Sequence, residues 1–303
     1  MAHPALKGLL HGTLSGDGTK VAVTTPFALA PTDTDFTLDL YRYDLVTETA
    51  TFEADMPDAV YPYGAAPQIS DDGSVILLLT GSPMMAGDDL TTPDLYVVEH
   101  GAGAVERVDA LGLVVASPSY YMTPPALSGD GQVIAWACRQ GGGVGHDSVC
   151  YVRRGLDRGA LPGPSGAILV NVALDDTGTN VSASCRLQDC AAVLAPLATG
   201  TWSTRSADGS GGIVTGAGDL SDDATVQLVH TADPASPMAC GQAGCTTVNR
   251  TWNGMIPTFP NIQVGFGRLS GDGQWVVLLS NATNLLPAGQ NPTQGLYVYH
   301  LPT

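Results

Sequence analysis

The sequence predicts an all-β protein, a six-bladed β-propeller of four-stranded antiparallel blades closed by an N-terminal strand. Three observations predict this fold. A strand–turn–strand unit recurs six times, glycine and proline are frequent while charged residues are few, and the cysteines recur at matching places in the repeats. We expect the whole chain, residues 1–303, to form one propeller domain.

The repeat begins with an aliphatic residue, followed by a small polar residue, a turn that contains aspartate or glycine, and a β-rich run. The aliphatic residue that opens each copy is, in order, Leu14, Ile69, Leu127, Leu174, Leu220 and Leu269. Successive copies are offset by 55, 58, 47, 46 and 49 residues. These offsets are typical of a four-stranded propeller blade with loops of variable length.

The turn of each copy is predicted to be a tight hairpin. Four copies read Ser-x-Asp-Gly, and glycine adopts the positive φ of such turns without steric cost. The fourth copy carries Asp175 and Thr177 instead, and the fifth carries Ala224 in place of the glycine. These exchanges put the turn geometry of two copies in question, whereas we expect the fold to persist.

A second strand is expected directly after each turn, because apolar residues occupy alternate positions there. The alternating pairs are Val21 and Val23, Ile76 and Leu78, Ile134 and Trp136, Val181 and Ala183, and Val276 and Leu278. A period of two describes a strand with one face packed against a neighbouring sheet. In the fifth copy Gln227 breaks this pattern beside Val229.

Two further strands are expected in each copy beyond a variable loop. The third strand is clearest at residues 39–43, 94–98 and 295–299. The fourth strand is expected at residues 49–54, 104–109, 201–205 and 250–253. The sixth copy has no room for a fourth strand of its own. We expect residues 2–7 to supply its outer strand, since Pro4 is tolerated at a sheet edge.

The composition suits this fold, because 37 glycines and 21 prolines favour short strands and tight turns over long helices. The formal net charge of −17 would repel a polyanion, so we expect no nucleic-acid partner. No apolar run approaches the roughly 20 residues of a membrane helix, so we expect no membrane span. Glycan, peptide and protein ligands remain open, and the sequence does not specify the oligomeric state.

The six cysteines follow the repeat. Cys138 and Cys185 are each the seventh residue after the turn glycine, whereas Cys240 is expected in a loop. The other three are expected near the start of third strands: Cys150, Cys190 and Cys245. This register favours three disulfides: Cys138–Cys150, Cys185–Cys190 and Cys240–Cys245.

Zinc coordination is the alternative to disulfides, but the close cysteine pairs lie in different repeats without a histidine beside them. Disulfides predict an extracellular or periplasmic location. The start of the chain lacks a signal-peptide pattern, so we expect the leader to have been removed.

The Ser-Gly-Asp-Gly turns followed by a strand, together with a later Asp-x-Tyr-like strand, resemble the TolB-type propeller repeats of exported bacterial proteins. Residues 280–287 with residues 295–299 match most closely, and the resemblance covers nearly the whole chain. It implies the propeller fold. For function it implies only a range of roles, namely protein-interaction modules, sugar-processing enzymes and peptidase accessory domains.

We expect a ligand to bind at one mouth of the central channel, where loops lead into the innermost strands. Four tyrosines fall in two of these loops: Tyr61, Tyr63, Tyr120 and Tyr121. Their flat rings with polar tips suit stacking on sugars or gripping a peptide. Three further candidates could converge near the axis: His11, Asp219 and Arg268. The alternative is structural, with the rings packed between blades and the polar groups hydrogen-bonded in the channel.

These candidates lead to two main hypotheses. The first is a secreted or periplasmic binding or protein-interaction propeller that recognises a glycan or peptide at the tyrosine-rich mouth. The second is a polysaccharide-acting hydrolase or lyase at the same mouth, with Tyr121 or His11 as base and Arg268 holding a substrate carboxylate. A purely structural domain of a longer surface protein is a third possibility. No motif specifies a catalytic residue.

Acidic pairs occur at Asp33 and Asp35 and at Asp88 and Asp89. Such pairs could bind calcium, but neither has the carboxylate spacing of a dedicated calcium loop. We therefore expect solvated acids, no metal and no cofactor.

Overall fold

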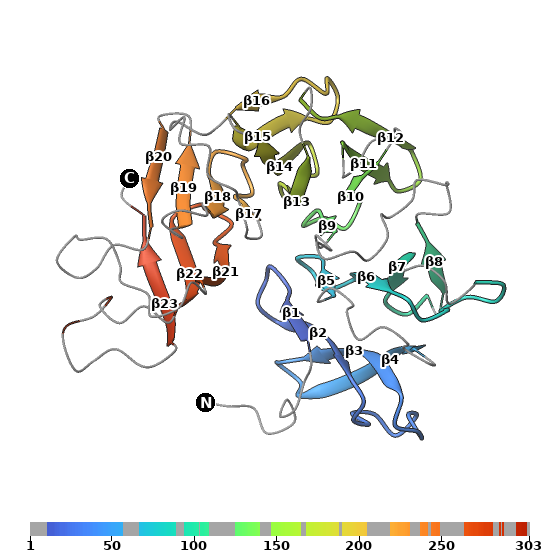
Figure 1. Cartoon of the computed structure of the whole chain (residues 1–303). Helices are drawn as coiled ribbons and strands as arrows, with labels where there is room; N and C mark the ends of the chain where they lie inside the picture. The colour runs from blue at the N-terminus through green and yellow to red at the C-terminus, as the bar shows by residue number, and fades with distance from the viewer. Residues whose placement is uncertain are drawn as a thin grey trace. The chain divides into compact units, whose positions relative to one another are not determined.

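A computed structural model gives the fold of the chain (Figure 1). It describes residues 11–56, 67–88, 94–102, 104–108, 125–139, 147–164, 168–187, 190–204, 219–230, 237–241, 244–248, 264–280, 285, 287 and 295–301. Regular structure in these residues consists of β-strands alone. None of the described residues therefore belongs to a helix that is long and apolar enough to cross a membrane.

The first three sheets each contain four strands, and hydrogen-bonded neighbours follow one another in the chain. The first sheet is formed by β1 (His11–Leu14), β2 (Lys20–Thr25), β3 (Leu38–Asp44) and β4 (Thr49–Met56). The second is formed by β5 (Gln68–Ile69), β6 (Val75–Thr80), β7 (Asp94–Glu99) and β8 (Val105–Arg107). The third is formed by β9 (Ala126–Leu127), β10 (Val133–Cys138), β11 (Ser148–Arg153) and β12 (Asp157–Pro162).

The last three sheets repeat this order, except that the sixth has three strands in the described part of the chain. The fourth sheet is formed by β13 (Leu169–Leu174), β14 (Asn180–Leu187), β15 (Cys190–Pro196) and β16 (Ser203–Thr204). The fifth is formed by β17 (Asp219–Leu220), β18 (Gln227–His230), β19 (Pro237–Gly241) and β20 (Gly244–Thr247). The sixth is formed by β21 (Val264–Leu269), β22 (Trp275–Ser280) and β23 (Gly295–His300).

The chain divides into two compact units. One comprises Met1–Gln140 with Cys150–Gly159, and the other comprises Gly141–Val149 with Ala160–Thr303. The first two sheets belong to the first unit and the last three to the second, while the strands of the third sheet are divided between the units.

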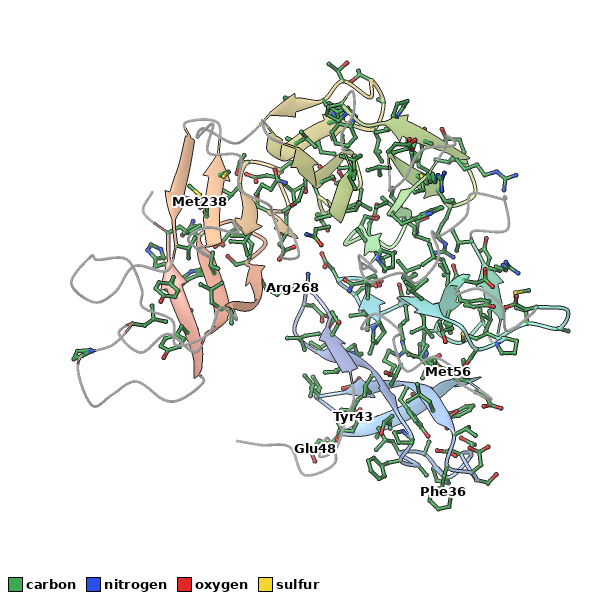
Figure 2. The ribbon with its side chains drawn as sticks, viewed as in Figure 1. Phe36, Tyr43, Glu48, Met56, Met238 and Arg268 are labelled. Carbon is green, nitrogen blue, oxygen red and sulfur yellow. A yellow bond between two sulfur atoms is a disulfide. The ribbon has the colours of Figure 1, made fainter. Side chains whose placement is uncertain are left out.

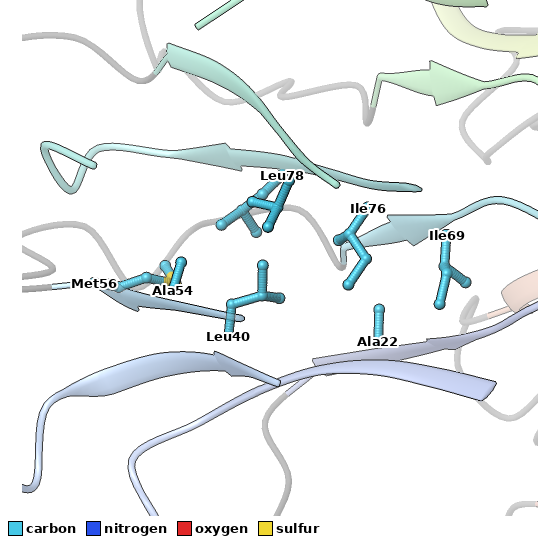
Figure 3. Close-up of a cluster of buried hydrophobic side chains, with 8 residues drawn as sticks. Ala22, Leu40, Ala54, Met56, Ile69, Ile76 and Leu78 are labelled. Carbon is cyan, nitrogen blue, oxygen red and sulfur yellow. The ribbon is translucent and has the colours of Figure 1, made fainter. Parts of the chain in front are cut away.

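Within each unit, apolar side chains bury the face of one sheet against the next. Between the first and second sheets, Ala22 of β2 and Leu40 of β3 pack with Ile76 and Leu78 of β6 (Figure 3). Between the fifth and sixth sheets, Leu228 of β18 packs with the corresponding face of β22. The second strand of the second sheet is thus buried on both faces, since all six residues of β6 are buried. This explains the apolar runs that follow each turn.

Backbone hydrogen bonds link the turn of one sheet to the turn of the next. The amide of Asp17 donates to the carbonyl of Asp71 at 3.0 Å, and the Asp71 amide donates to Gly129 at 2.8 Å. In the second unit, the Asp222 amide donates to the carbonyl of Gly271 at 2.8 Å. The Asp176 amide lies 3.4 Å from the Asp222 carbonyl. The turns therefore form a continuous hydrogen-bonded series within each unit.

The turns themselves keep one geometry in all six copies. Ala224 has a φ of 56°, close to the 73° of Gly73 at the equivalent position. In the fourth copy, the Asp175 carboxylate accepts the backbone amide of Asn180 at 3.1 Å. The hydroxyl of Ser70 accepts the corresponding amide in the second copy. The exchanges in these two copies change the hydrogen-bond partners and the strain, and they leave the turn in place.

The third and fourth strands of the fifth sheet were wrongly assigned from the sequence. The third and fourth strands of the fifth sheet lie at Pro237–Gly241 and Gly244–Thr247, whereas the sequence predicted a fourth strand at residues 250–253. Cys240 therefore lies in the third strand and not in a loop. Its register partner Cys245 lies in the fourth strand. The proline and glycines that bound β19 make it read as a loop in the sequence. The predicted closing strand, residues 2–7, lies outside the described residues.

Candidate functional site

Two of the predicted site residues meet on neighbouring innermost strands of the second unit. Asp219 is the first residue of β17, and Arg268 lies near the end of β21 (Figure 2). Nη1 of Arg268 lies 3.9 Å from Oδ1 of Asp219. The Asp219 carboxylate also accepts the backbone amide of Leu269 at 2.8 Å and that of Leu220 at 3.1 Å. These bonds fix the carboxylate beside the guanidinium, although the residues are far apart in the sequence.

The electrostatics of this pair hold the positively charged guanidinium of Arg268 in place while leaving it accessible to solvent. Burial raises the pKa of Asp219, while Arg268 and the amide of Leu269 act in the opposite direction. The Arg268 side chain is 52% exposed, and at 3.9 Å its contact with Asp219 is an ion pair and not a hydrogen bond. Its N–H donors are therefore available to an anionic or hydroxylated ligand.

The innermost strands of the fourth and sixth sheets each contain a β-bulge. The β13–β14 register shifts between Val170 and Ala173, where Asn171 has a φ of 54°. The β21–β22 register shifts between Val264 and Gly267. Each bulge lies a few residues before the aliphatic anchor of its repeat. Bulges redirect side chains and are frequent beside functional sites.

The other predicted ligand-binding residues cannot be placed beside this pair. His11 opens β1, and its backbone lies opposite Thr24, but its side chain is not among those described. The four tyrosines lie outside the described residues: Tyr61, Tyr63, Tyr120 and Tyr121. Their role at a tyrosine-rich mouth stays a prediction.

A second group of charged residues gathers in the first sheet. Carboxylate oxygens of Asp33, Asp35 and Asp39 lie within 4.8 Å of one another, close enough for one cation to contact all three. Asp39 is 2% exposed. Its burial, together with the charges of Asp33, Asp55 and Asp35, raises its pKa to about 7. The hydroxyl of Tyr41 donates to Asp33.

The second sheet places the positively charged side chain of Arg107 beside the equivalent aspartate. There, Asp94 corresponds to Asp39, because each residue lies opposite the last residue of the second strand. Arg107 donates from Nη1 to Asp88 at 2.8 Å and from Nη2 to Asp94 at 2.6 Å. The aspartates of this sheet are thereby neutralised by a side chain of the protein itself.

The expectation of solvated acids is therefore wrong for Asp33 and Asp88. Asp33 is 9% exposed, and the Asp88 side chain is 3% exposed in its ion pair with Arg107. Sequence reasoning missed Asp39 because it stands in a third strand, apart from the adjacent acidic pairs. The available signal was its place two residues before a tyrosine, which Asp94 shares.

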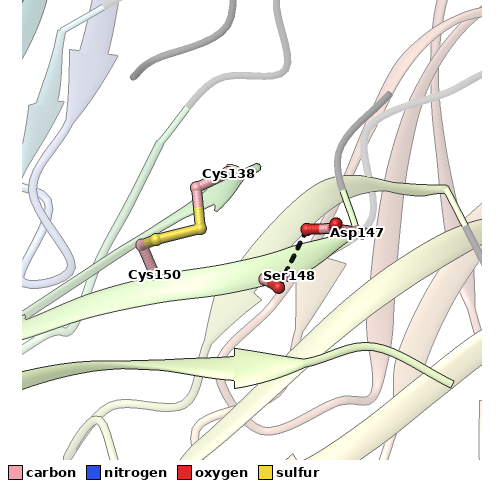
Figure 4. The surroundings of a disulfide bond; sticks show 4 residues. All are labelled: Cys138, Asp147, Ser148 and Cys150. Atoms are coloured by element: carbon pink, nitrogen blue, oxygen red, sulfur yellow. Dashed lines mark hydrogen bonds between the residues drawn. A yellow bond between two sulfur atoms is a disulfide. The ribbon is translucent and has the colours of Figure 1, made fainter. Parts of the chain in front are cut away.

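Two of the three predicted disulfides involve cysteines that the structure describes. Cys138 at the end of β10 is bonded to Cys150 of β11, with the Cα atoms 5.7 Å apart (Figure 4). Cys240 is also disulfide-bonded, and the β19–β20 register sets Cys245 directly opposite it. No described cysteine side chain is a free thiol. The pairing of Cys185 with Cys190 stays a prediction.

Within each unit, antiparallel sheets pack on one another and are linked through their turns, which is the construction of the β-propeller class. The solved structures that resemble this protein include TolB from Acinetobacter baumannii, with a TM-score of 0.51 and 15% sequence identity over 92% of this chain. They also include the oligogalacturonate lyase VPA0088 from Vibrio parahaemolyticus, with a TM-score of 0.56 and 11% identity over 97% of this chain. The chain has the fold of TolB-like β-propellers.

An oligogalacturonate lyase in complex with manganese gives a TM-score of 0.59 at 11% identity, again over 97% of this chain. This chain spans 63% of the TolB chain and 77% of each lyase chain. No family model and no curated protein matches the sequence.

Proposed function

We propose that the protein is an exported binding propeller that recognises a glycan or a peptide where loops lead into its innermost strands. The observation that carries this proposal is the Asp219–Arg268 pair. A partly buried carboxylate holds a half-exposed guanidinium on adjacent inner strands. A guanidinium in such a position binds carboxylates, and it also donates to sugar hydroxyls and peptide carbonyls.

The six sheets are proposed to close as six blades, with residues 2–7 adding the outer strand of the sixth. The three-stranded sheet supports this closure, because β23 is its last described strand. Export to the periplasm or the extracellular space is supported by the Cys138–Cys150 disulfide, since such bonds persist in oxidising compartments.

A lyase or hydrolase acting on a polysaccharide is the second candidate. The observation that favours it is the likeness to two structures named as oligogalacturonate lyases. In this reading Arg268 would hold a substrate carboxylate through its exposed N–H donors. Tyr121 or His11 is proposed as the base in this reading.

A glycan and peptide array tests the proposal. We expect Arg268→Ala to reduce retention of the bound ligand at least tenfold and Arg268→Lys to restore it only in part. The matched control is Arg153→Ala, because Arg153 has a similar acidic partner, Asp157 at 3.7 Å, on the third sheet. Equal retention by wild type and Arg268→Ala would remove the pair from the site.

The same ligand distinguishes binding from catalysis. After prolonged incubation, mass spectrometry should recover it unchanged if the protein is a binding module. Shortened chains with unsaturated ends would instead indicate a lyase, and shortened chains with an added water a hydrolase.

A further inference from the structure

The interface between the fourth and fifth sheets contains polar side chains, whereas the interface of the first with the second sheet and that of the fifth with the sixth are apolar. Its apolar part is a small cluster in which Ala173 of β13 and Leu194 of β15 pack with Leu220 and Ala224 of the fifth sheet. The strands β13 and β17 contact each other, as do β15 and β18.

Ser182 points into this interface from the fourth sheet. It lies directly opposite Ala173 on one side and Leu194 on the other, and residues opposite each other on neighbouring strands share a face. Ser184 lies two positions further along β14 and therefore shares that face. Both serines are 0% exposed.

Gln227 points into the same interface from the fifth sheet, because it lies directly opposite Leu220. The repeat supports this placement. The equivalent positions of Ser182 and Gln227 hold Ala22 and Ile76 between the first and second sheets, and these residues pack in one cluster. Leu228 and Val276 do the same between the fifth and sixth sheets. Ser182 and Gln227 thus form a polar pair between the fourth and fifth sheets, at positions where the other two interfaces hold an apolar pair.

The polar atoms of these side chains have no hydrogen-bond partner within the described part of the chain. This holds for Oε1 and Nε2 of Gln227 and for the hydroxyls of Ser182 and Ser184. Gln227 is 1% exposed. Buried amides and hydroxyls are almost always hydrogen-bonded, and leaving them unpaired is costly. The interface therefore requires a partner that both donates and accepts.

We propose that Gln227, Ser182 and Ser184 form a buried binding site for ordered water between the fourth and fifth sheets. Water is the ligand whose chemistry fits, because it can accept from the Gln227 amide nitrogen and donate to the amide oxygen. A serine hydroxyl can take either role and complete the coordination. Internal waters with about three such partners are a regular part of globular folds.

A crystal structure at a resolution of about 1.8 Å or better tests the site directly. We expect a density peak about 2.7–3.2 Å from the Gln227 side-chain amide and from at least one of the two serine hydroxyls. An interface without such a peak, in which Gln227 bonds only to protein groups, would overturn the proposal.

A double-mutant cycle tests the same site in solution. Ser182→Ala and Gln227→Val remove the proposed ligands of one water. We expect the unfolding equilibrium constant of the double variant to differ about tenfold from the product of the single effects. The control cycle combines Ser182→Ala with Val276→Ala at another interface, where the effects should multiply. Effects that multiply within a factor of two for Ser182 and Gln227 would contradict a shared water.

Discussion

Asp39 of β3 lies directly opposite Asp55 of β4, and two further aspartates raise the local negative charge around it. In the second sheet the equivalent aspartate, Asp94, is neutralised by Arg107, whose guanidinium donates hydrogen bonds to Asp88 and Asp94. The first sheet thus carries a buried carboxylate whose pKa is raised to about 7.

The first prediction is that Asp39→Asn stabilises the protein at pH 8 and has little effect at pH 4. An aspartate ionises near pH 3.9 in the unfolded chain but near pH 7 here. The wild type therefore loses stability as the pH rises between these values, and the loss levels off above pH 7. We expect a gain of about 2 kcal/mol at pH 8.

Urea unfolding at pH 4 and pH 8, with EDTA to remove cations, measures this effect. The matched control is Asp17→Asn, because Asp17 is exposed, hydrogen bonds from Ser15 and Thr19 lower its pKa, and it does not contribute to the shift at Asp39. A gain of equal size at both pH values would show that charge is not the cause.

The second prediction concerns two turn glycines with the same backbone conformation. Gly18 and Gly131 have φ values of 72° and 70°. A Cβ on Gly18 would meet nothing within 4 Å, whereas one on Gly131 would lie 2.8 Å from Cγ2 of Val75. We expect Gly18→Ala to cost about 1 kcal/mol through backbone strain alone. Gly131→Ala should cost about 2–3 kcal/mol, because overpacking is added to the strain. Denaturant midpoints of the two variants provide the comparison, and a larger loss for Gly18→Ala would refute it.

The third prediction follows from the altered turn of the fourth sheet. Asp175 is buried and accepts both the backbone amide and the side-chain amide of Asn180. We expect Asp175→Ala to destabilise the protein by about 2 kcal/mol, because it leaves these donors without their acceptor. The double variant Asp175→Ser/Thr177→Asp restores the sequence of the common turn. It should unfold within about 1 kcal/mol of the wild type, and thermal unfolding followed by circular dichroism would reveal a failure of this rescue.

The fourth prediction concerns the disulfides. Replacing Cys138 and Cys150 by serine opens a loop of 12 residues and should cost about 3 kcal/mol. Reductant should lower the stability of the wild type further, because we expect all six cysteines to be paired. Thiol titration in denaturant should find no free thiol in the oxidised protein. Six titratable thiols would contradict the disulfide assignment and the exported location inferred from it.

Much of the fold could be predicted because each turn is encoded locally. The Ser-x-Asp-Gly sequence specifies the hairpin by short-range hydrogen bonds, such as that from the Ser70 hydroxyl to Asp72. The repeats therefore located the first and second strands of all six sheets. The third and fourth strands of the fifth sheet were misplaced, because β19 is short and packing defines it more than its composition does.

The candidate site was only partly predictable. The inner-strand positions of Asp219 and Arg268 follow from the repeat, but their ion pair joins residues of different sheets. The buried state of Asp39 was missed because it stands in a third strand, where Asp55 of the neighbouring strand adds to the charges of Asp33 and Asp35. Contacts between strands, such as Asp39 with Asp55 and Asp219 with Arg268, cannot be derived from spacing alone.

The hydrogen bonds between consecutive turns constrain how such a chain can change in length. The middle turn of each unit offers one amide to its successor and one carbonyl to its predecessor, as Asp71 and Asp222 do. Duplication or loss of a complete copy keeps the backbone donors and acceptors of the turns matched. Adding or removing half a copy would leave one amide and one carbonyl without a partner. We therefore expect changes in the length of this protein to occur by whole repeats.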